Sequence, residues 1–155
     1  MNEKALEIRI SQVSWQSHQA QLKAVREVVF VQEQEVPLYI EWDDMDATAQ
    51  HLLVYLTEDI NQEKPIGCAR LLHINGVGKI GRMAVLKEFR GLGVGMAILQ
   101  KAIAIHQAQH FNTIKLSAQV HAISFYQRAG FEVVSATYQD ANIVHVDMQL
   151  AQKLT

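Results

Sequence analysis

The sequence predicts a mixed α/β fold (mixed α+β), in which helices cover both faces of a central sheet. Short runs of alternating apolar and polar residues are typical of strands, and apolar residues recur at helical spacing in other segments. Their order is strand, helix, three strands, helix, strand, short helix and two strands. Strands interleaved with helices in this way favour a sheet packed between layers of helix.

The first strand and the first helix are indicated by local pattern. Residues 6–10 alternate between apolar and charged side chains, which predicts a half-buried strand. Ser14 or Ser17 can cap the helix that follows, because a serine hydroxyl accepts a backbone N–H of the first turn. Leucine and valine at helical spacing carry this helix to about Gln32.

The segment from Val36 to Gln50 is predicted to be a loop, because Pro37 cannot continue a helix. The loop is rich in acidic residues, and we expect a solvated surface rather than a site for a cation or an amine. These acids are Glu41, Asp43, Asp44 and Asp46.

The remaining strands are short and apolar, with polar or glycine-containing turns between them. A short helix around Phe125 lies between two of them and ends at Gly130, a residue that favours helix termination. The predicted strands are His51–Leu56, Ile66–Ile74, a fourth that ends at Leu86, Thr113–Ala118, Phe131–Ala136 and Ile143–Leu150.

A glycine-rich turn stands between the fourth strand and the second long helix. The strand ends in Met83-Ala84-Val85-Leu86, the turn runs from Lys87 to Gly95, and apolar residues at helical spacing follow to Ile105. The first N–H groups of a helix have no intrahelical partner and carry partial positive charge. Glycines let an anion approach the backbone closely. The turn therefore predicts a phosphate site, with Arg90 at its rim.

Spacing excludes two better-known phosphate loops. A Walker A loop ends in Gly-Lys-Ser/Thr, whereas Gly95 is followed by Met96-Ala97. A dinucleotide fingerprint needs a third glycine where this chain has Met96, and an acidic residue at the end of the next strand. The strand Thr113–Ala118 contains no acidic residue.

Composition sets limits on the class of protein. We expect one domain over residues 1–155, with 49% hydrophobic and 19% charged residues. The net charge of -2 gives no reason to expect nucleic acid as a partner. No apolar run approaches the ~20 residues that span a bilayer, and no signal peptide is recognisable, so we expect no membrane association. The single cysteine, Cys68, is interpreted as a core residue and suits the cytoplasm.

Two motifs now identify a family. Arg90-x-x-Gly93-x-Gly95, directly after a strand, resembles the R/Q-x-x-G-x-G/A motif of the GNAT superfamily of acetyl-CoA-dependent N-acetyltransferases. The segment from Ala122 to Phe131 is similar to the A-x-x-F-Y-x-x-x-G-F signature that follows the fifth strand in GNAT enzymes. The predicted order of elements agrees with the same family.

The resemblance extends over most of the chain to the ElaA/YjcF-type branch of predicted acetyltransferases. The matching residues come from the first helix, the acidic loop and the last strand. They are Arg26, Phe30, Glu33, Gln34, Pro37, Glu41, Asp43, Asp46, His51, Asp140, Ala141, Ile143, His145 and Met148.

The family implies a mostly antiparallel sheet of six to seven strands that is splayed between strands four and five. It implies direct transfer from acetyl-CoA to a primary amine of a small molecule or peptide, by a monomer or homodimer. His106 and His110 have a spacing that suits a metal, but no third ligand is placed, and we expect no metal. The acetyl-CoA contacts that the family implies are Met83, Ala84, Val85, Arg90, Gly91, Leu92, Gly93, Val94, Gly95, Met96, Phe125, Tyr126 and Arg128.

Three residues are candidates for catalysis. Tyr126 is the candidate acid, because a phenol beside the sulfur can protonate the departing thiolate. His145 is the preferred base for the amine, since histidine titrates near neutrality, and Glu33 is its competitor. The alternative function is a GNAT-like module that binds acyl-CoA for regulation without efficient transfer. A degenerate module would tend to lose Tyr126 or His145, so their joint presence favours an enzyme.

Overall fold

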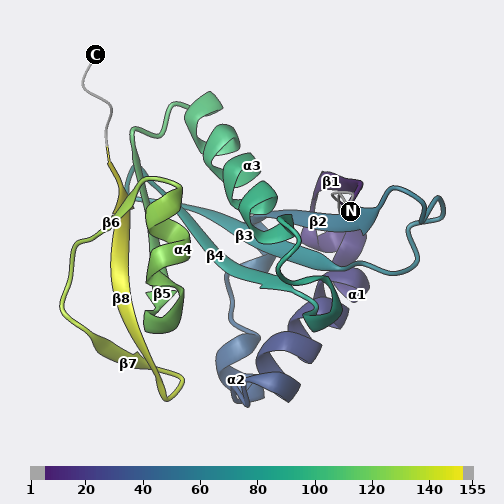
Figure 1. Cartoon of the computed structure of the whole chain (residues 1–155), viewed down its shortest axis with the longest axis horizontal. Helices are drawn as coiled ribbons and strands as arrows, with labels where there is room; N and C mark the ends of the chain where they lie inside the picture. Colours follow the sequence, from purple (N-terminus) through teal and green to yellow (C-terminus); the bar gives the residue numbers. More distant parts are fainter. Residues whose placement is uncertain (1–5, 152–155) are drawn as a thin grey trace, which may run out of the picture.

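The computed structural model describes residues 6–151, which form an eight-stranded sheet with helices on both faces. The strand order is β1-β2-β3-β4-β5-β8-β6, and β7 pairs with β8 (Figure 1). Every pair is antiparallel except β4 with β5. The predicted fold class is confirmed, with the short β7 as an additional strand.

The helices and strands are short and follow one another closely. The strands are β1 Ile8–Val13, β2 Gln50–Leu56, β3 Gly67–Ile74, β4 Val77–Val85, β5 Thr113–Gln119, β6 Phe131–Val133, β7 Tyr138–Asp140 and β8 Ile143–Leu150. The α-helices are α1 Trp15–Arg26, α2 Leu38–Glu41, α3 Val94–Ala108 and α4 Ile123–Arg128. Among the described residues, no helix is long and apolar enough to cross a membrane.

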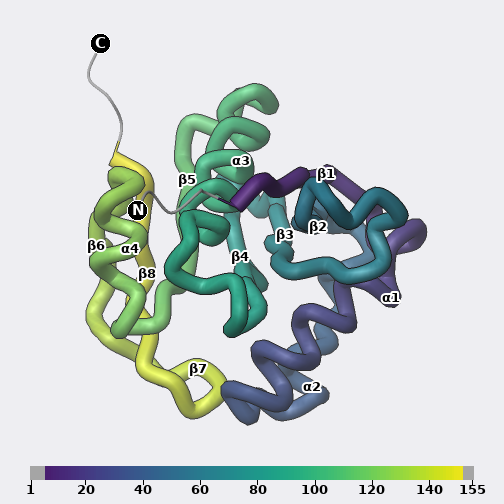
Figure 2. Tube along the Cα trace, turned by 45° about the vertical axis from the view of Figure 1, so that its right-hand side comes forward, coloured from purple at the N-terminus to yellow at the C-terminus, as the bar shows by residue number. Residues whose placement is uncertain are grey.

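Two hydrophobic clusters place helices on opposite faces of the sheet. One cluster packs α3 against the sheet through Ile98 and Leu99, and it also includes side chains from β2, β3, β5 and β8. The second packs α1 against the other face, through Leu22 and Val25. Figure 2 shows α3 and α1 on either side of the central strands. Cys68 lies in the second cluster, where burial raises the pKa of its thiol to about 12, so the interpretation as a core residue holds.

The sheet is open between β4 and β5. These parallel strands pair only from Val77 with Thr113 to Ile80 with Leu116. Beyond Ile80 they diverge (Figure 1), so the second half of β4 has no strand on this side. The predicted splay therefore lies at the carboxyl ends of the two strands, where ligands bind in open α/β sheets.

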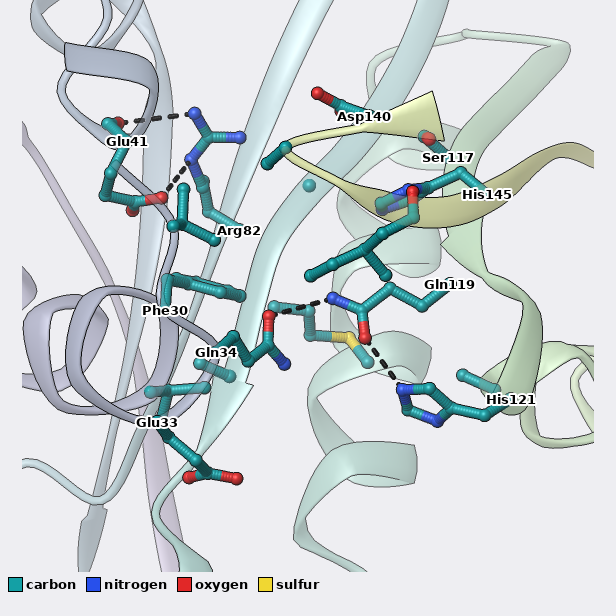
Figure 3. Close-up of a pocket in the computed structure, with 18 of the residues that line it drawn as sticks. Phe30, Glu33, Gln34, Glu41, Arg82, Ser117, Gln119, His121, Asp140 and His145 are labelled. Carbon is teal, nitrogen blue, oxygen red and sulfur yellow. Dashed lines mark hydrogen bonds and ion pairs between the residues drawn. The ribbon is translucent and has the colours of Figure 1, made fainter. Parts of the chain in front are cut away.

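The first helix begins as predicted and ends differently. Ser14 is its N-cap, and its hydroxyl accepts the Ser17 N–H at 3.2 Å. After Arg26 the chain widens into a π-helix, Glu27–Glu33. π-Helical turns are rare in proteins overall, and those that occur are often found at functional sites. This one projects Phe30, Glu33 and Gln34 toward the open side of the sheet (Figure 3).

The interpretation of segment 36–50 as a solvated acidic loop was wrong. The segment contains α2 and a 3₁₀ turn, Asp46–Thr48, and the side chains of Glu41 and Asp46 are buried. Arg26 lies between them, with Nε 2.6 Å from Glu41 and Nη1 2.7 Å from Asp46. The acids turn inward because buried arginines neutralise them, and buried charges require such partners.

The same ion cluster draws on two further strands. Arg70 of β3 binds Asp43 and Asp46 through Nη1, and Arg82 of β4 binds Glu41 and Asp43. His51 Nε2 is 2.9 Å from the Asp46 carbonyl. The cluster fixes the segment before β2 against the open edge of β4.

The predicted sixth strand, Phe131–Ala136, was too long. β6 ends at Val133, because the Ser135 hydroxyl takes the Asp147 N–H at 2.8 Å in place of a backbone carbonyl. The chain then leaves the ladder and returns as β7, which pairs with β8 from Tyr138 to Asp140.

Candidate active site

Two adjoining cavities lie where β4 and β5 diverge. The first, which we call the cleft cavity, has a volume of about 650 Å³ and lies between the π-helix, β4, the end of β5 and the β7–β8 turn. The second, the loop cavity, has a volume of about 750 Å³ and lies between the glycine-rich turn and α4. Residues that line both are Met83, Val85, Arg90, Ala122 and Tyr126.

The floor of the loop cavity is the N-terminus of α3. No side chain caps this helix, and its first bond runs from the Ala97 N–H to the Gly93 carbonyl at 3.1 Å. The N–H groups of the preceding turn therefore have no helical acceptor. Gly91 and Gly93 adopt left-handed φ angles of 76° and 86°, which favour glycine. The uncapped helix start and the left-handed glycines are the local features on which the predicted phosphate site depends.

Most of the predicted acetyl-CoA contacts do line the loop cavity. Three do not: Ala84 and Val94 are buried in the core, and Leu92 is 42% exposed. Packing favours glycine at position 95, since a Cβ there would lie 3.3 Å from the Phe125 ring. Arg128 stands over the same ring, 5.8 Å from its centroid.

A bulge aims the backbone of β4 into the opening. Arg82 and Met83 lie opposite the single residue Ala69, and Arg82 has a φ angle of 47°. Leu86 donates its N–H to Ile66 on the β3 side. Backbone N–H and C=O groups point to alternate sides along a strand. Those of Met83 and Val85 therefore face the side from which β5 has diverged.

Glu33 and Arg90 are paired across the boundary of the two cavities. Arg90 donates from Nη1 and Nη2 to the two Glu33 carboxylate oxygens at 2.6 and 2.7 Å, and from Nε to the Val85 carbonyl at 2.9 Å. The hydrogen bond from Arg90 lowers the pKa of Glu33. A carboxylate held ionised in this way is a weak base.

His145 is oriented for proton acceptance. Its side chain is 8% exposed and lines the cleft cavity (Figure 3). Nδ1 lies 2.7 Å from the Ile143 carbonyl and must donate to it, because a carbonyl only accepts. In the neutral ring Nε2 is then the unprotonated nitrogen.

Tyr126 lies at the junction of the cavities. Its ring packs edge-to-face with Phe125 and Phe131. Burial raises the pKa of its phenol to about 12, so the group keeps its proton over the whole working range of pH. It is thus placed and protonated as an acid would need to be.

Three polar residues that the sequence analysis did not assign to the site form a chain across the cleft cavity. His121 Nε2 lies 2.7 Å from Gln119 Oε1, and Gln119 Nε2 donates to Gln34 Oε1 at 2.9 Å (Figure 3). The chain links the end of β5 to the π-helix. One signal was available: Gln119 and His121 stand at the carboxyl end of a strand beside the splay.

The histidine pair considered for a metal does not lie in the site. His106 is fully buried, Nε2 is 2.9 Å from the Lys79 carbonyl, and the ring packs against His73 and Phe111. Within residues 6–151 no group of three His, Cys, Asp or Glu side chains is arranged so that it could hold a metal ion.

Known proteins resemble this chain in sequence and in structure. A family model described as an acetyltransferase (GNAT) domain matches residues 29–152. The uncharacterized N-acetyltransferase YjcF of Bacillus subtilis (strain 168) is 41% identical over 128 residues, which is 80% of this chain and 86% of YjcF. Protein ElaA of Escherichia coli (strain K12) is 30% identical over 133 residues, 82% of this chain and 83% of ElaA.

Solved structures agree. The crystal structure of Escherichia coli ElaA superposes with a TM-score of 0.81 at 26% identity, over 93% of this chain and 99% of that one. An acyl-CoA N-acyltransferase from Pseudomonas aeruginosa gives a TM-score of 0.81 at 26% identity, over 94% of this chain and all of its own. The chain belongs to the GNAT acetyltransferase family and is an acyltransferase.

Proposed function

We propose that the protein transfers an acetyl group from acetyl-CoA directly to a primary amine of a small molecule. The single observation that carries this proposal is the place of Tyr126, which lines both cavities. One cavity offers an anion site, the other offers a base, and a protonated phenol stands between them. Acetyl-CoA and a single buried cysteine both suit the cytoplasm.

The residues present fit acetyl-CoA. The N–H groups at the start of α3 and the left-handed glycines are suited to a pyrophosphate. Backbone groups of Met83 and Val85 are suited to the amides of the pantetheine arm, although Arg90 already occupies the Val85 carbonyl. The Met83 N–H would polarise the thioester carbonyl, which stabilises the oxyanion that develops there.

Each candidate side chain then has one task. His145 Nε2 accepts a proton from the amine, because an ammonium group cannot attack. The phenol of Tyr126 gives a proton to the departing sulfur. Held side by side, amine and thioester react without the entropy cost of meeting in solution, and this positioning supplies much of the catalysis.

The regulatory alternative requires a site that binds but does not react. His145 lines the cleft cavity, and its Nε2 carries no proton in the neutral ring, an arrangement that proton transfer needs and binding alone does not. This observation favours the enzyme.

Two measurements test the proposal. Isothermal calorimetry should detect acetyl-CoA binding, and the melting temperature should rise with it, because a ligand of the folded state stabilises that state. A free-thiol assay over a library of primary amines should then show CoA release that depends on the amine. Absence of binding at millimolar acetyl-CoA would refute the proposal.

A further inference from the structure

The far end of the cleft cavity carries two opposed polar groups that the mechanism does not use. These are the guanidinium of Arg82 on β4 and the carboxylate of Asp140 at the end of β7. Figure 3 shows them on opposite sides of the cavity, pointing toward each other, with His145 nearby. No ion pair joins them among the described residues, and both line the same cavity, in which a ligand group can lie.

The ion cluster holds Arg82 through Nη2 and Nε, and leaves Nη1 outside those contacts. Nη2 donates to the carbonyls of Ile40 and Glu41 at 3.1 and 3.2 Å and to Asp43 at 3.2 Å. Nε lies 3.1 Å from the Glu41 carboxylate. Nη1 has no hydrogen-bond partner among the described residues, and Figure 3 shows it on the side away from Glu41. A donor fixed in this way costs no ordering when it binds an oxygen.

Asp140 is the matching acceptor. It ends β7, and the next two residues, Ala141 and Asn142, have φ angles of 50° and 62°. Two left-handed residues in a two-residue turn are typical of a tight hairpin, which fixes the strand residue on each side. The Asp140 carboxylate is exposed and makes no hydrogen bond or ion pair with the described residues.

The charge around the cavity points the same way. Three carboxylates line it, Glu33, Glu41 and Asp140, against two guanidiniums, Arg82 and Arg90. Glu33 is neutralised by Arg90, and Glu41 by Arg26 and Arg82. Asp140 alone lacks a cationic partner, so the cavity favours an acceptor with one net positive charge.

We propose that the acceptor is a small diamino acid, held by its α-carboxylate on Arg82 and its α-ammonium on Asp140. This assignment rests on the proposed function and names its substrate class. The amine at the end of the side chain is the one that reacts, since the head group occupies the far end of the cavity. A basic diamino acid carries the single positive charge that the cavity favours.

The reaction balances without a further reagent. The side-chain nitrogen attacks the thioester carbonyl carbon, a C–N bond forms and the C–S bond breaks. Before the attack His145 takes one proton from the side-chain ammonium and later releases it to water. The thiolate takes the proton of Tyr126, and the second proton that the nitrogen loses as the amide forms restores the phenol. The products are the side-chain N-acetyl amino acid and CoA.

Four acceptors test the assignment. Lysine and ornithine have the complete head group, cadaverine lacks the carboxylate, and 6-aminohexanoate lacks the α-ammonium. The free-thiol assay should give lysine or ornithine a kcat/KM at least about tenfold above both truncated amines, the scale of one lost charged hydrogen bond. Mass spectrometry should place the acetyl group on the side-chain nitrogen. Equal rates for a truncated amine, or acetylation of the α-nitrogen, would overturn the assignment.

Variants separate the two contacts. Asp140→Asn should lower kcat/KM for the preferred diamino acid about tenfold and leave 6-aminohexanoate unaffected. Arg82→Lys should lower kcat/KM for the diamino acid and leave kcat/KM for cadaverine unchanged. The melting temperature of the variant is measured to confirm that it folds. Asp44→Asn is the control, because Asp44 is exposed and lies outside the cavity. An Asp140→Asn variant that behaves like Asp44→Asn contradicts the assignment.

The outcome also separates this assignment from the proposed function. Acetylation of other amines only, with acetyl-CoA bound, overturns the diamino acid and leaves the acetyltransferase intact. If acetyl-CoA does not bind at all, both are overturned.

Discussion

Glu33 and Arg90 form a two-point ion pair that joins the π-helix to the glycine-rich turn. Both carboxylate oxygens accept from the guanidinium, at 2.6 and 2.7 Å. The sequence predicted both residues in the site but in separate roles, Glu33 as a base and Arg90 as an acetyl-CoA contact. Their pairing predicts that neither acts alone.

Glu33→Gln should change turnover by less than about fivefold and leave the pH profile unaltered. Because Arg90 lowers the pKa of Glu33, the carboxylate is already ionised throughout the neutral range, and no proton leaves or joins it there. The pH dependence of kcat/KM in the free-thiol assay checks this. A variant that lost both rate and pH dependence would identify Glu33 as the base.

His145→Ala should lower kcat about a hundredfold at neutral pH, the low end for a general base. The pH dependence of the rate should differ between the unaltered enzyme and the variant, because the variant has no group to accept the proton of the amine. Acetyl-CoA affinity should be kept, because the loop cavity does not include His145. If rate and profile both survive, the amine loses its proton to water and His145 is structural.

Tyr126→Phe should reduce kcat while the KM for acetyl-CoA stays nearly constant. The ring packing against Phe125 and Phe131 is kept, and only the proton donor is lost. Since burial raises the phenol pKa to about 12, the unaltered enzyme should show no loss of rate from this group below pH 10. Single-turnover kinetics isolates the chemical step, and an unchanged rate there removes the acid role.

Gly93→Ala should weaken acetyl-CoA binding, and Gly76→Ala provides a matched control. Both glycines have left-handed φ angles, 86° and 77°, and a Cβ at either position meets no protein atom. Each substitution should cost about 1–2 kcal/mol of stability through backbone strain. Calorimetry should find weaker binding for the Gly93 variant alone, because Gly93 lines the loop cavity, where we propose the phosphate site, and Gly76 does not. Equal affinities of the two variants for acetyl-CoA would mean that the phosphates bind elsewhere.

Arg26→Ala should destabilise the fold by about 3–5 kcal/mol, because Glu41 and Asp46 lose the cation buried between them. Arg9→Ala, on the exposed side of β1, should stay within about 0.5 kcal/mol. Urea unfolding measures both. Similar values for the two variants would mean that the remaining arginines neutralise the cluster without Arg26.

Local features of the site could be predicted from sequence. The glycine-rich turn is a contiguous segment whose conformation depends on its own residues, and the Phe125-Tyr126 helix has a similar character. The ion cluster could not be predicted, because a run of acidic residues has the same sequence pattern whether water or arginine surrounds its side chains. The three arginines, at positions 26, 70 and 82, meet only after one helix and two strands have assembled.

Contacts between distant segments were also missed. Gln34 and Gln119 are 85 residues apart, and nothing in either neighbourhood marks them as partners. Their contact follows from the divergence of β4 and β5, which a strand pattern does not encode. The end of β6 was misplaced for a smaller reason, since a serine hydroxyl can replace a backbone acceptor without altering the apolar pattern.

The gap beside β4 has a consequence for how such proteins change over evolutionary time. A ligand that lies along Met83 and Val85, and over the start of α3, would be recognised largely by backbone N–H and C=O groups, which every amino acid except proline carries. Substitutions along these segments leave that recognition in place as long as the glycines and the bulge persist. The walls of the cleft cavity are made of side chains instead, so acceptor choice can drift while the donor stays the same.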